Sequence, residues 1–546
     1  MADESHDTSI TETSLEQIDK LYAKHQQKFK SRATIPVEWR IYNLKQLWWM
    51  IKDNEAAIQA ASKEDLDTGP LACSISDLWP VYNEIALAIR RLPTWVKPEV
   101  RWWDSQLAFK FMCPTIRKQP KGVCLIISPW NYPWQLSLVP LVHAIAAGCP
   151  VMLKPSEHSP ACSALLAKLL PQYLDSGAYS VVLGGPQQAA HLLEKSWGHI
   201  LFTGSGRIGS MVATAAAKTL TPMTLELGGK SPVIVSKCAD LRKIARRIFS
   251  IKQLTCGQMC VTPDYILCDR EVVKEFVEEC KQTLEHFFPP APSEQSMLKQ
   301  PFTSRLRTKE SYDRMQSFME QADSAGRLAY KGEANAGSLR MGFSLVLLNE
   351  DGVGETGPLI EEEIFGPVLP IIPYSSLDTA IEYINNGPDP LAIYVCSSKR
   401  SVFKRVCEET MSGSCTWNDF AFSTFARSLP FGGVGASGYG AYHGEDGFKT
   451  FTHQKSTLEI PLYFEPLMSL RYPPITAFGQ TVLTSLLLTG SSFNRPRSVR
   501  DERIRWYQGL PWMYIVGVAF ACVFAVLVNL DNIQARTGMR AQTLNI

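Results

Sequence analysis

Three side chains of the sequence could together oxidise a carbonyl carbon. Cys260 closes the stretch TCGQMC, Glu226 opens the stretch ELGGK, and Asn131 lies within PWNYP. A thiol, a carboxylate and an amide donor are the groups that oxidation of an aldehyde through a thioester requires. The residue types therefore suggest the hypothesis that Cys260 is a nucleophile, a role that this set of residues does not suggest for the other cysteines.

Each of the three residues would have a defined role in that reaction. The Cys260 thiolate would attack the carbonyl carbon, and the resulting oxyanion needs hydrogen-bond donors that are in place beforehand. The side-chain amide of Asn131 and the backbone N–H of Cys260 are the candidate donors. Loss of hydride leaves a thioester, and water activated by Glu226 would release the carboxylic acid. Because a free thiol has a pKa of about 8.5, Cys260 needs help to ionise at neutral pH.

Other interpretations of the same residues stay open at this stage. A cysteine is most often a small buried hydrophobe, Asn131 could be a turn residue before Pro133, and Glu226 could be a helix cap. His443 offers a Cys–His protease pair with Cys260. A non-oxidative thioesterase or acyltransferase would use the same cysteine, and a membrane scaffold would keep the fold without turnover.

The composition narrows the class of protein. A chain of 546 residues, 45% of them hydrophobic, suggests two to four domains with ample core. The 55 basic and 53 acidic residues give a net charge of +2, which argues against nucleic acid as a partner. Fourteen cysteines are too dilute for a disulfide scaffold. No paired CxxC or HExxH motif occurs, so no metal site is expected.

The fold class follows from apolar runs that alternate with helical segments. Helical spacing is seen over 13–30, 36–62, 136–147, 160–174 and 272–287. Strands are predicted at 123–128, 150–153, 180–183, 199–202, 234–235, 264–268, 344–348 and 368–373. Residues 289–305 and 325–340 are predicted to be rich in loops. The alternation predicts an α/β protein with two doubly wound, Rossmann-like domains.

Two segments are candidates for holding a nucleotide. Gly204 opens the stretch GSGRIG, which satisfies GxGxxG after a predicted strand, and the Rossmann template would then make Glu226 the ribose-binding acid. The stretch LKPSE at 153–157 also follows a predicted strand. A glycine motif alone is weak, because glycines also open ordinary turns. Both segments could serve one nucleotide in different roles.

The ordered set of motifs resembles the aldehyde dehydrogenase superfamily, and within it the class 3, fatty-aldehyde type. The resemblance covers about residues 15–465. The stretches that carry it are PWNYPW at 129–134, LKPSE at 153–157, FTGS at 202–205, ELGGKSP at 226–232, GQMC at 257–260, EEIFGPV at 362–368, LPFGGVG at 429–435 and GAYHG at 440–444.

The resemblance implies a cofactor and a division of labour among the residues. The cofactor is NAD, with NADP possible because Lys154 softens the repulsion between Glu157 and a 2′-phosphate. By resemblance, Lys154 and Glu157 hold the adenosine ribose, Gly204 and Ser205 line the pyrophosphate, Glu363 holds the nicotinamide ribose, and Phe365 packs near its ring. Glu226 becomes the catalytic base, and His443 falls in a structural motif. Thr255 departs from the pattern, which has an asparagine there.

The chain is divided as follows in this interpretation. Residues 1–12 are a disordered tail, 13–225 a NAD-binding domain with bridging strands near 101–119, and 226–435 a catalytic domain. The chain returns to the first domain over 436–465 and adds a second bridging strand. An apolar and basic extension over 466–505, a transmembrane anchor over 506–530 and a short tail over 531–546 complete it.

The anchor is predicted from a long uncharged run. No charged residue occurs between Trp506 and Leu530, and about 20 apolar residues are enough to cross a bilayer. Arginines crowd the upstream side of this run, at 495, 497, 500, 503 and 505, which predicts a cytosolic catalytic part. A buried core helix is the alternative. The choice among endoplasmic reticulum, lipid droplet and mitochondrial outer membrane stays open.

The expected partners follow from the anchor and the resemblance. A membrane-bound enzyme with an apolar segment at 465–494 favours a long, lipid-soluble fatty aldehyde, with apocarotenoid and aromatic aldehydes as alternatives. The resemblance implies a homodimer in which the bridging strands pair across subunits.

Overall fold

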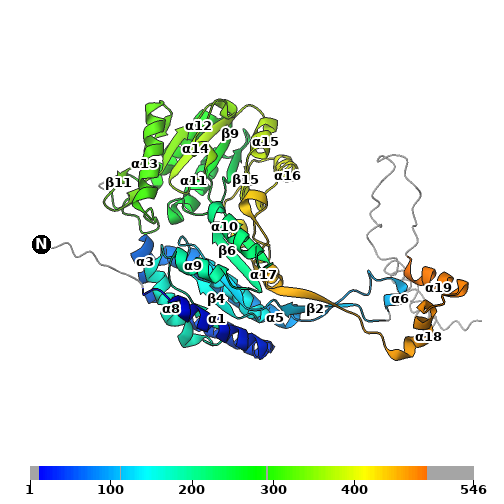
Figure 1. The fold of residues 1–546 in the computed structure, drawn as a ribbon. Helices are drawn as coiled ribbons and strands as arrows, with labels where there is room; N and C mark the ends of the chain where they lie inside the picture. The colour runs from blue at the N-terminus through cyan, green and yellow to red at the C-terminus, as the bar shows by residue number, and fades with distance from the viewer. Residues whose placement is uncertain (1–10, 111, 291–292, 489–546) are drawn as a thin grey trace, which may run out of the picture. The chain divides into compact units, whose positions relative to one another are not determined.

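The structure is a computed structural model that describes residues 11–110, 112–290 and 293–488. The chain divides into two compact units, the first made of residues up to 97 together with 118–454, and the second of 98–117 together with the residues from 455 onward. The first unit contains two large sheets with helices around them (Figure 1). The predicted α/β class is confirmed, and both large sheets are mixed.

One sheet of the first unit has six strands in the order β17-β7-β6-β3-β4-β5. The strands are β3 (Cys124–Ile127), β4 (Val151–Lys154), β5 (Tyr179–Val181), β6 (His199–Gly204), β7 (Met223–Leu227) and β17 (Gly438–Tyr439). Only β17 runs antiparallel to its neighbour. Since β4 and β6 flank β3 on opposite sides, the strand order reverses there, and ligands bind at the carboxyl edge of such reversals.

Helices surround this sheet, and their sequences have the patterns expected of amphipathic or buried helices. They are α1 (Leu15–Lys30), α2 (Val37–Asp53), α3 (Glu55–Leu66), α4 (Pro70–Cys73), η1 (Ser74–Leu78), α5 (Trp79–Trp95), α7 (Gln135–Ala147), α8 (Pro160–Tyr173), α9 (Pro186–Leu193), α10 (Gly206–Ala217) and α17 (Gly444–Thr450). The helix predicted over 36–62 is broken at Asn54, whose side chain donates to the carbonyl of Met50 at 2.8 Å. Nearly every residue of α7 is buried, so it packs as a core helix.

The other sheet has seven strands in the order β10-β13-β14-β9-β8-β15-β16. The strands are β8 (Pro232–Val235), β9 (Tyr265–Asp269), β10 (Leu328–Tyr330), β13 (Ser344–Leu347), β14 (Val368–Tyr374), β15 (Ala392–Cys396) and β16 (Ser414–Trp417). Only β10 is antiparallel. Because β7 ends at Leu227 and β8 begins at Pro232, the chain passes from one sheet to the other in the segment 228–231.

The second sheet has its own helices and small elements. They are α11 (Leu241–Lys252), η2 (Gln253–Thr255), α12 (Val273–Phe287), α13 (Lys309–Ser324), β11 (Ala334–Asn335), β12 (Arg340–Met341), η3 (Glu350–Gly352), α14 (Pro358–Glu361), α15 (Leu377–Asn386), α16 (Arg400–Glu409), η4 (Phe422–Phe425) and η5 (Gly435–Ser437). The prediction of loops over 325–340 is partly wrong, because β10, β11 and β12 form there. Short antiparallel pairing, which local sequence signals poorly, stabilises that region.

The second unit contains a small sheet and short helices. Its elements, two of whose strands continue into the first unit, are β1 (Glu99–Val100), α6 (Leu107–Lys110), β2 (Thr115–Pro120), β18 (Thr452–Thr457), η6 (Leu462–Phe464), α18 (Glu465–Met468), η7 (Ser469–Arg471) and α19 (Ala477–Leu487). The sheet has the order β1-β2-β18. The side chains of Thr115 and Thr457 bond to each other at 2.5 Å across β2 and β18.

Some predictions fall on residues outside the described ranges. They are most of the tail at 1–12, part of the extension at 466–505, the anchor at 506–530 and the tail at 531–546. Within the described ranges, no helix is long and apolar enough to span a bilayer.

Candidate active site

Two cavities of the first unit meet at Cys260 and Glu226. Cavity A, of about 50 Å³, is lined largely by apolar and aromatic side chains. Cavity B, of about 300 Å³, lies at the carboxyl edge of the six-stranded sheet and reaches the segment around Glu363. The residues that line both are Leu136, Thr203, Glu226, Leu227 and Cys260. A thiol and a carboxylate therefore lie where two separate spaces join.

The loop that carries Cys260 is held by close backbone packing. Cys256 and Gly257 both have positive φ, at 53° and 79°. A Cβ on Gly257 would lie 2.2 Å from the carbonyl oxygen of Gly366, so only glycine fits there. The buried Lys252 ammonium donates to the carbonyl of Pro263 at 2.7 Å, and burial lowers the pKa of Lys252 to about 8. These contacts fix the loop on both sides of Cys260.

The thiol of Cys260 is a weak acid in this setting. Burial, followed by the charges of Glu363 and Glu226, raises the pKa of the Cys260 thiol above its usual range. The side chain is partly exposed to the cavities, in contrast to the buried Cys256 and Cys268. The Cys260 side chain can thus be reached from the cavities, but its thiol needs a base or a nearby cation to ionise.

Glu226 lies within β7, with Thr203 and Gly438 as its partners on the neighbouring strands. Its side chain is 2% exposed, and neither carboxyl oxygen has a hydrogen-bond partner among the described residues. Burial raises the pKa of Glu226 well above its usual value. Its place in a strand excludes the helix-cap interpretation. A buried carboxyl without partners beside a thiol is suited to accept a proton.

Asn131 lies in the loop between β3 and α7 and lines cavity B. Its side-chain amide donates to the carbonyl oxygen of Gln258 at 3.0 Å, two residues before Cys260. Behind this loop, the buried Asp77 carboxylate accepts from the backbone N–H of Trp134 and Gln135 at the start of α7. The loop is anchored at both ends, so the amide has a fixed position.

Cavity B has the features of a site for a dinucleotide. Gly204 and Ser205 line it directly before α10, where free backbone N–H groups favour anions. Glu363 also lines the cavity, packed so closely against the backbone of Gly228 that a Cβ on Gly228 would lie 2.1 Å from the carboxylate oxygen of Glu363. Phe365 also lines cavity B, in edge contact with Trp130 at 5.9 Å between ring centroids. The backbone at Gly204, the aromatic pair of Phe365 and Trp130, and the carboxylate of Glu363 as a hydrogen-bond acceptor are groups that suit a dinucleotide.

Lys154 and Glu157 lie beside cavity B and not in its wall. Lys154 ends β4 in register with Ile127 of β3, at the same edge of the sheet as Asn131. The Lys154 ammonium and the Glu157 carboxylate form an ion pair at 2.9 Å. The structure therefore brings together Cys260, Glu226, Asn131, Gly204, Ser205, Glu363 and Phe365 around the cavities, with the Lys154–Glu157 pair outside the wall.

Cavity A contains residues that the sequence did not single out. Its wall includes four aromatic side chains, namely Tyr132, Phe425, Phe431 and Tyr442. Three of them fall inside stretches recognised from the sequence (129–134, 429–435 and 440–444), which was the available signal. Phe425 lies outside any such stretch, and only the fold brings it to the wall.

His443 lines cavity A but is unsuited to a Cys–His pair. Its Nε2 accepts a hydrogen bond from Arg427 at 2.9 Å, which leaves the ring proton on Nδ1. Burial, then the charge of Arg427, lowers the pKa of His443 well below its usual value. A histidine that is already an acceptor toward arginine cannot take the proton of a thiol.

Thr255 packs behind the site. It is 4% exposed, and the Tyr132 hydroxyl donates to its side-chain oxygen at 3.5 Å. Both the backbone N–H and the side-chain amide of Gln258 donate to the carbonyl of Thr255, at 3.0 Å each. The backbone of Thr255 thus supports the residue to which Asn131 is bonded, whatever its side chain contributes.

Comparisons with known proteins agree on one family. The family model described as "Aldehyde dehydrogenase family" matches residues 2–457. The chain is 40% identical to aldehyde dehydrogenase family 3 member B1 of Bos taurus, covering 85% of this chain and 96% of that protein. It is also 40% identical to family 3 member A2 of Pongo abelii, covering 82% and 89%. The solved substrate-bound state of Staphylococcus aureus AldH is 32% identical, with a TM-score of 0.77 over 83% of this chain and 99% of that one.

Proposed function

The chain belongs to the aldehyde dehydrogenase family as an NAD(P)-dependent enzyme, and from this premise we propose that it oxidises a long hydrophobic aldehyde through Cys260. The observation that carries the proposal is the junction of the two cavities at Cys260 and Glu226. The carbonyl end of the aldehyde enters cavity A and the nicotinamide end of the cofactor enters cavity B, so that the carbonyl carbon lies between the thiol and the cofactor.

The first step forms a bond between the Cys260 sulfur and the carbonyl carbon. The thiolate adds, and the carbonyl oxygen becomes an oxyanion. One hydrogen of the Asn131 amide is engaged by Gln258, which orients the amide and leaves its second hydrogen for the oxyanion. The backbone N–H of Cys260 is the second donor.

The cofactor, when bound, accepts the hydride that leaves the former carbonyl carbon. Of the residues that line cavity B, Gly204 and Ser205 would hold its pyrophosphate, Glu363 would hold the nicotinamide ribose, and Phe365 would pack beside the ring. Lys154 and Glu157 would hold the adenosine ribose. Departure of hydride collapses the oxyanion to a thioester on Cys260.

Glu226 serves the second half of the reaction. A water molecule adds to the thioester carbon, its proton goes to the Glu226 carboxylate, and the C–S bond breaks to return the thiolate and the carboxylic acid. The raised pKa of Glu226 makes its carboxylate a stronger base than an exposed glutamate.

The substrate class is inferred from the wall of cavity A. Aromatic and aliphatic side chains there favour an apolar chain, for which fatty aldehydes are the first candidates. The test is a panel of saturated aldehydes from two to sixteen carbons, with retinal-like and aromatic aldehydes, each with NAD and NADP. The proposal predicts kcat/KM that rises with chain length in wild type and no NADH with Cys260→Ala. A preference for short or aromatic aldehydes would contradict the fatty substrate, and acyl transfer without NAD would favour the thioesterase or acyltransferase alternative.

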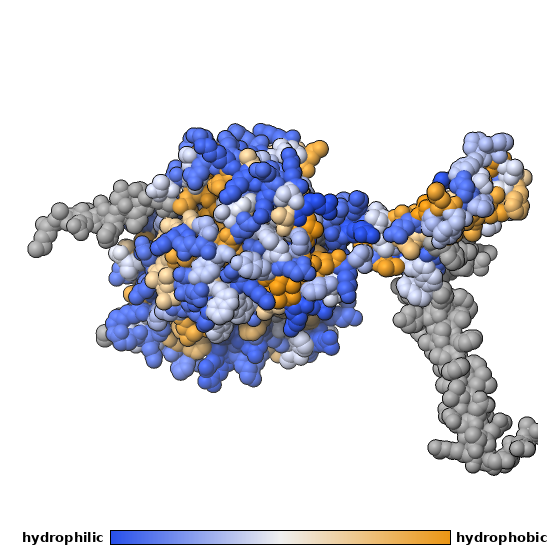
Figure 2. Space-filling view, turned by 90° about the horizontal axis from the view of Figure 1, so that it is seen from below, coloured by the Kyte–Doolittle hydropathy of each residue, from blue (hydrophilic) through white to orange (hydrophobic). Residues whose placement is uncertain are grey.

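We also propose that the enzyme works at a membrane, held by residues 506–530. Large hydrophobic side chains of the second unit are exposed, with Leu462 88%, Tyr463 77% and Phe478 71% exposed. Figure 2 shows hydrophobic residues on one face of this unit. Exposed apolar surface of this kind favours a lipid layer. The full chain is expected to stay with membranes after alkaline carbonate washing, and Val518→Arg with Val523→Arg to release it. Retention of that double variant would contradict the anchor.

A homodimer is proposed on the second unit as well. β18 is an edge strand of the three-stranded sheet, and most of its side chains are exposed. An unpaired edge invites a strand from another chain. Light scattering of the detergent-solubilised protein is expected to give twice the chain mass, and a monomer would contradict the proposal.

A further inference from the structure

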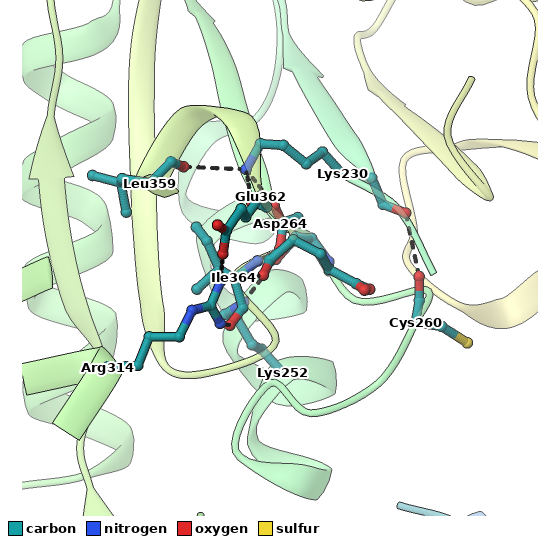
Figure 3. A network of polar contacts seen from close by, with 11 residues as sticks. Lys230, Lys252, Cys260, Asp264, Arg314, Leu359, Glu362 and Ile364 are labelled. Atoms are coloured by element: carbon teal, nitrogen blue, oxygen red, sulfur yellow. Dashed lines mark hydrogen bonds and ion pairs between the residues drawn. The ribbon is translucent and has the colours of Figure 1, made fainter. Parts of the chain in front are cut away.

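The ammonium group of Lys230 is bonded to three acceptors from two segments of the chain. Its Nζ lies 2.7 Å from the Asp264 carboxylate, 2.9 Å from the carbonyl oxygen of Glu362 and 3.2 Å from that of Leu359 (Figure 3). Three acceptors use all three hydrogens of the ammonium. Lys230 itself lies in the segment 228–231, between β7 with Glu226 and β8.

Asp264 links the same segments from the side of the Cys260 loop. It follows Cys260 by one short turn, is 4% exposed, and uses one carboxylate oxygen for Lys230. The other oxygen accepts the backbone N–H of Ile364 at 2.8 Å, and the N–H of Asp264 donates to the carbonyl of Ser231 at 2.9 Å. The Ser231 hydroxyl in turn donates to the carbonyl of Cys260 at 3.4 Å. One carboxylate thereby connects the cysteine loop with the residue after Glu363.

A second cation, Arg314 of α13, holds the same strip of backbone. Its guanidinium donates to the carbonyl of Glu363 at 2.7 Å and to that of Ile364 at 2.9 Å, and it pairs with the Glu362 carboxylate at 3.1 Å. Together with Lys230 and Asp264, it fixes the main chain directly before and after Glu363. Figure 3 shows both cations converging on this strip.

The strip carries Glu363 and Phe365, the two side chains through which it lines cavity B, and it is strained. Phe365 has φ of 51°, a left-handed conformation that a bulky residue keeps only where surrounding contacts impose it. The Glu363 carboxyl is held against Gly228, two residues before Lys230. The polar contacts are therefore concentrated where the backbone departs from its preferred conformation and where cavity B requires a set position for Glu363 and Phe365.

We propose that Lys230 and Asp264 are positioning residues that hold Glu363 and Phe365 at a fixed place relative to Cys260. The inference rests on the proposed roles of Cys260 and Glu363. Neither Lys230 nor Asp264 lines the cavities, so they act through the backbone of 362–364 and through Ser231. Buried ion pairs contribute little net stability compared with apolar packing. We therefore attribute to the pair of Lys230 and Asp264 the role of fixing the backbone of 362–364.

The first test compares Lys230→Met with wild type on two properties. The dissociation constant of NAD, from quenching of tryptophan fluorescence without aldehyde, is expected to rise at least about tenfold. The primary deuterium isotope effect on kcat with a 1-deuterated aldehyde is expected to increase, because a displaced cofactor slows hydride transfer. A folded variant with wild-type NAD affinity and isotope effect would overturn the proposal.

The double variant Lys230→Met with Asp264→Asn guards against misfolding, because it leaves no unpaired buried charge. It is expected to fold, to keep the acceptor for Ile364, and still to bind NAD more weakly, since Leu359 and Glu362 lose their donor. Wild-type affinity in the double variant would overturn the proposal. The matched control is Lys237→Met with Glu271→Gln, an exposed pair at 2.9 Å remote from the cavities, for which no change is expected.

The two readouts separate this inference from the proposed function. If wild type forms no NADH from any aldehyde, the proposed function fails, yet NAD binding by the variants still tests the positioning role. If wild type is active while both variants bind NAD normally with an unchanged isotope effect, only the positioning role fails.

Discussion

The side-chain amide of Asn131 donates to the carbonyl oxygen of Gln258 at 3.0 Å, two residues before Cys260. This bond ties the loop after β3 to the loop that carries the thiol, although 127 residues separate them. It also aims the amide, because an amide nitrogen with one hydrogen engaged can rotate little. Preorganised donors of this kind are what stabilise an oxyanion without reorganisation at the moment of reaction.

Replacement of Asn131 by alanine should therefore lower kcat by about 10²–10³-fold, as expected for removal of one oxyanion donor. The aldehyde KM should change much less, since the donor acts mainly on the charged intermediate. Steady-state kinetics with decanal measures both. Asn385→Ala is the control, because that exposed amide also donates to a backbone carbonyl, at 2.9 Å to Glu409. A loss of less than threefold for Asn131→Ala would remove its proposed role.

The acidity of Cys260 gives a pH prediction. Its pKa lies above the usual range, through burial and then through Glu363 and Glu226, so alkylation by iodoacetamide without cofactor should be slow at pH 7 and rise steadily toward pH 10. Glu226→Gln removes one negative neighbour and lowers the thiol pKa, so alkylation at pH 9 should become faster, by about tenfold per pKa unit until the thiol is fully ionised. Peptide mass spectrometry assigns the alkylated cysteine. A slower reaction in this variant would show that Glu226 acts as the base for the thiol itself.

The wall of cavity A contains a residue, Phe425, that we expect to set the preference for long over short aldehydes. Phe425 is 37% exposed and lines the cavity, so Phe425→Ser removes apolar contact from a long chain but not from a short one. The ratio of kcat/KM for decanal over propanal should fall about tenfold, in line with the loss of about half a buried aromatic contact. Phe422→Ser is the control from the same turn, because Phe422 does not line the cavity. Equal losses on both aldehydes would place the substrate elsewhere.

We expect Glu157 to influence the choice between NAD and NADP. Its carboxylate is paired with Lys154 at 2.9 Å; at the adenosine ribose, the role proposed for this pair, the carboxylate would repel the additional phosphate of NADP and the lysine would attract it. Glu157→Gln should raise the ratio of kcat/KM for NADP over NAD about tenfold, the effect of one partly screened charge. Glu194→Gln, a carboxylate that is 74% exposed, is the control. An unchanged ratio would separate Glu157 from the nucleotide.

Much of this arrangement was predictable from local sequence. Continuous apolar runs predicted β3 and β4 because both strands are buried along their whole length. The motifs located Cys260, Glu226 and Asn131. Each motif combines a side chain that oxidation through a thioester requires with the glycine or turn residues that hold it in place. Amphipathic spacing in α13, where Tyr312, Met315, Phe318, Met319 and Ala322 are buried, was also present but lies between loops rich in Pro and Gly that obscured it.

Other parts depend on contacts between distant segments. β17 joins the six-stranded sheet beside Glu226 from more than 200 positions later in the chain, and a two-residue strand has no periodicity to detect. The wall of cavity A combines Ser76, Tyr132, Leu254, Leu391 and Phe425, which no spacing rule relates. The bonds of Lys230 to Leu359 and Glu362 likewise need the two loops to be placed first. Local patterns determine elements, whereas cavities arise where elements meet.

The formation of a thioester on Cys260 is tested most directly in the Glu226→Gln variant, which should form the intermediate and hydrolyse it slowly. Rapid mixing with decanal and saturating NAD is predicted to release about one NADH per active site in a burst, followed by turnover at least about 10²-fold slower than wild type. After quenching, the peptide containing Cys260 should carry one decanoyl group, and the additional change Cys260→Ala should abolish both burst and label. No burst, or a decanoyl group on another residue, would contradict the role of Cys260 as the nucleophile.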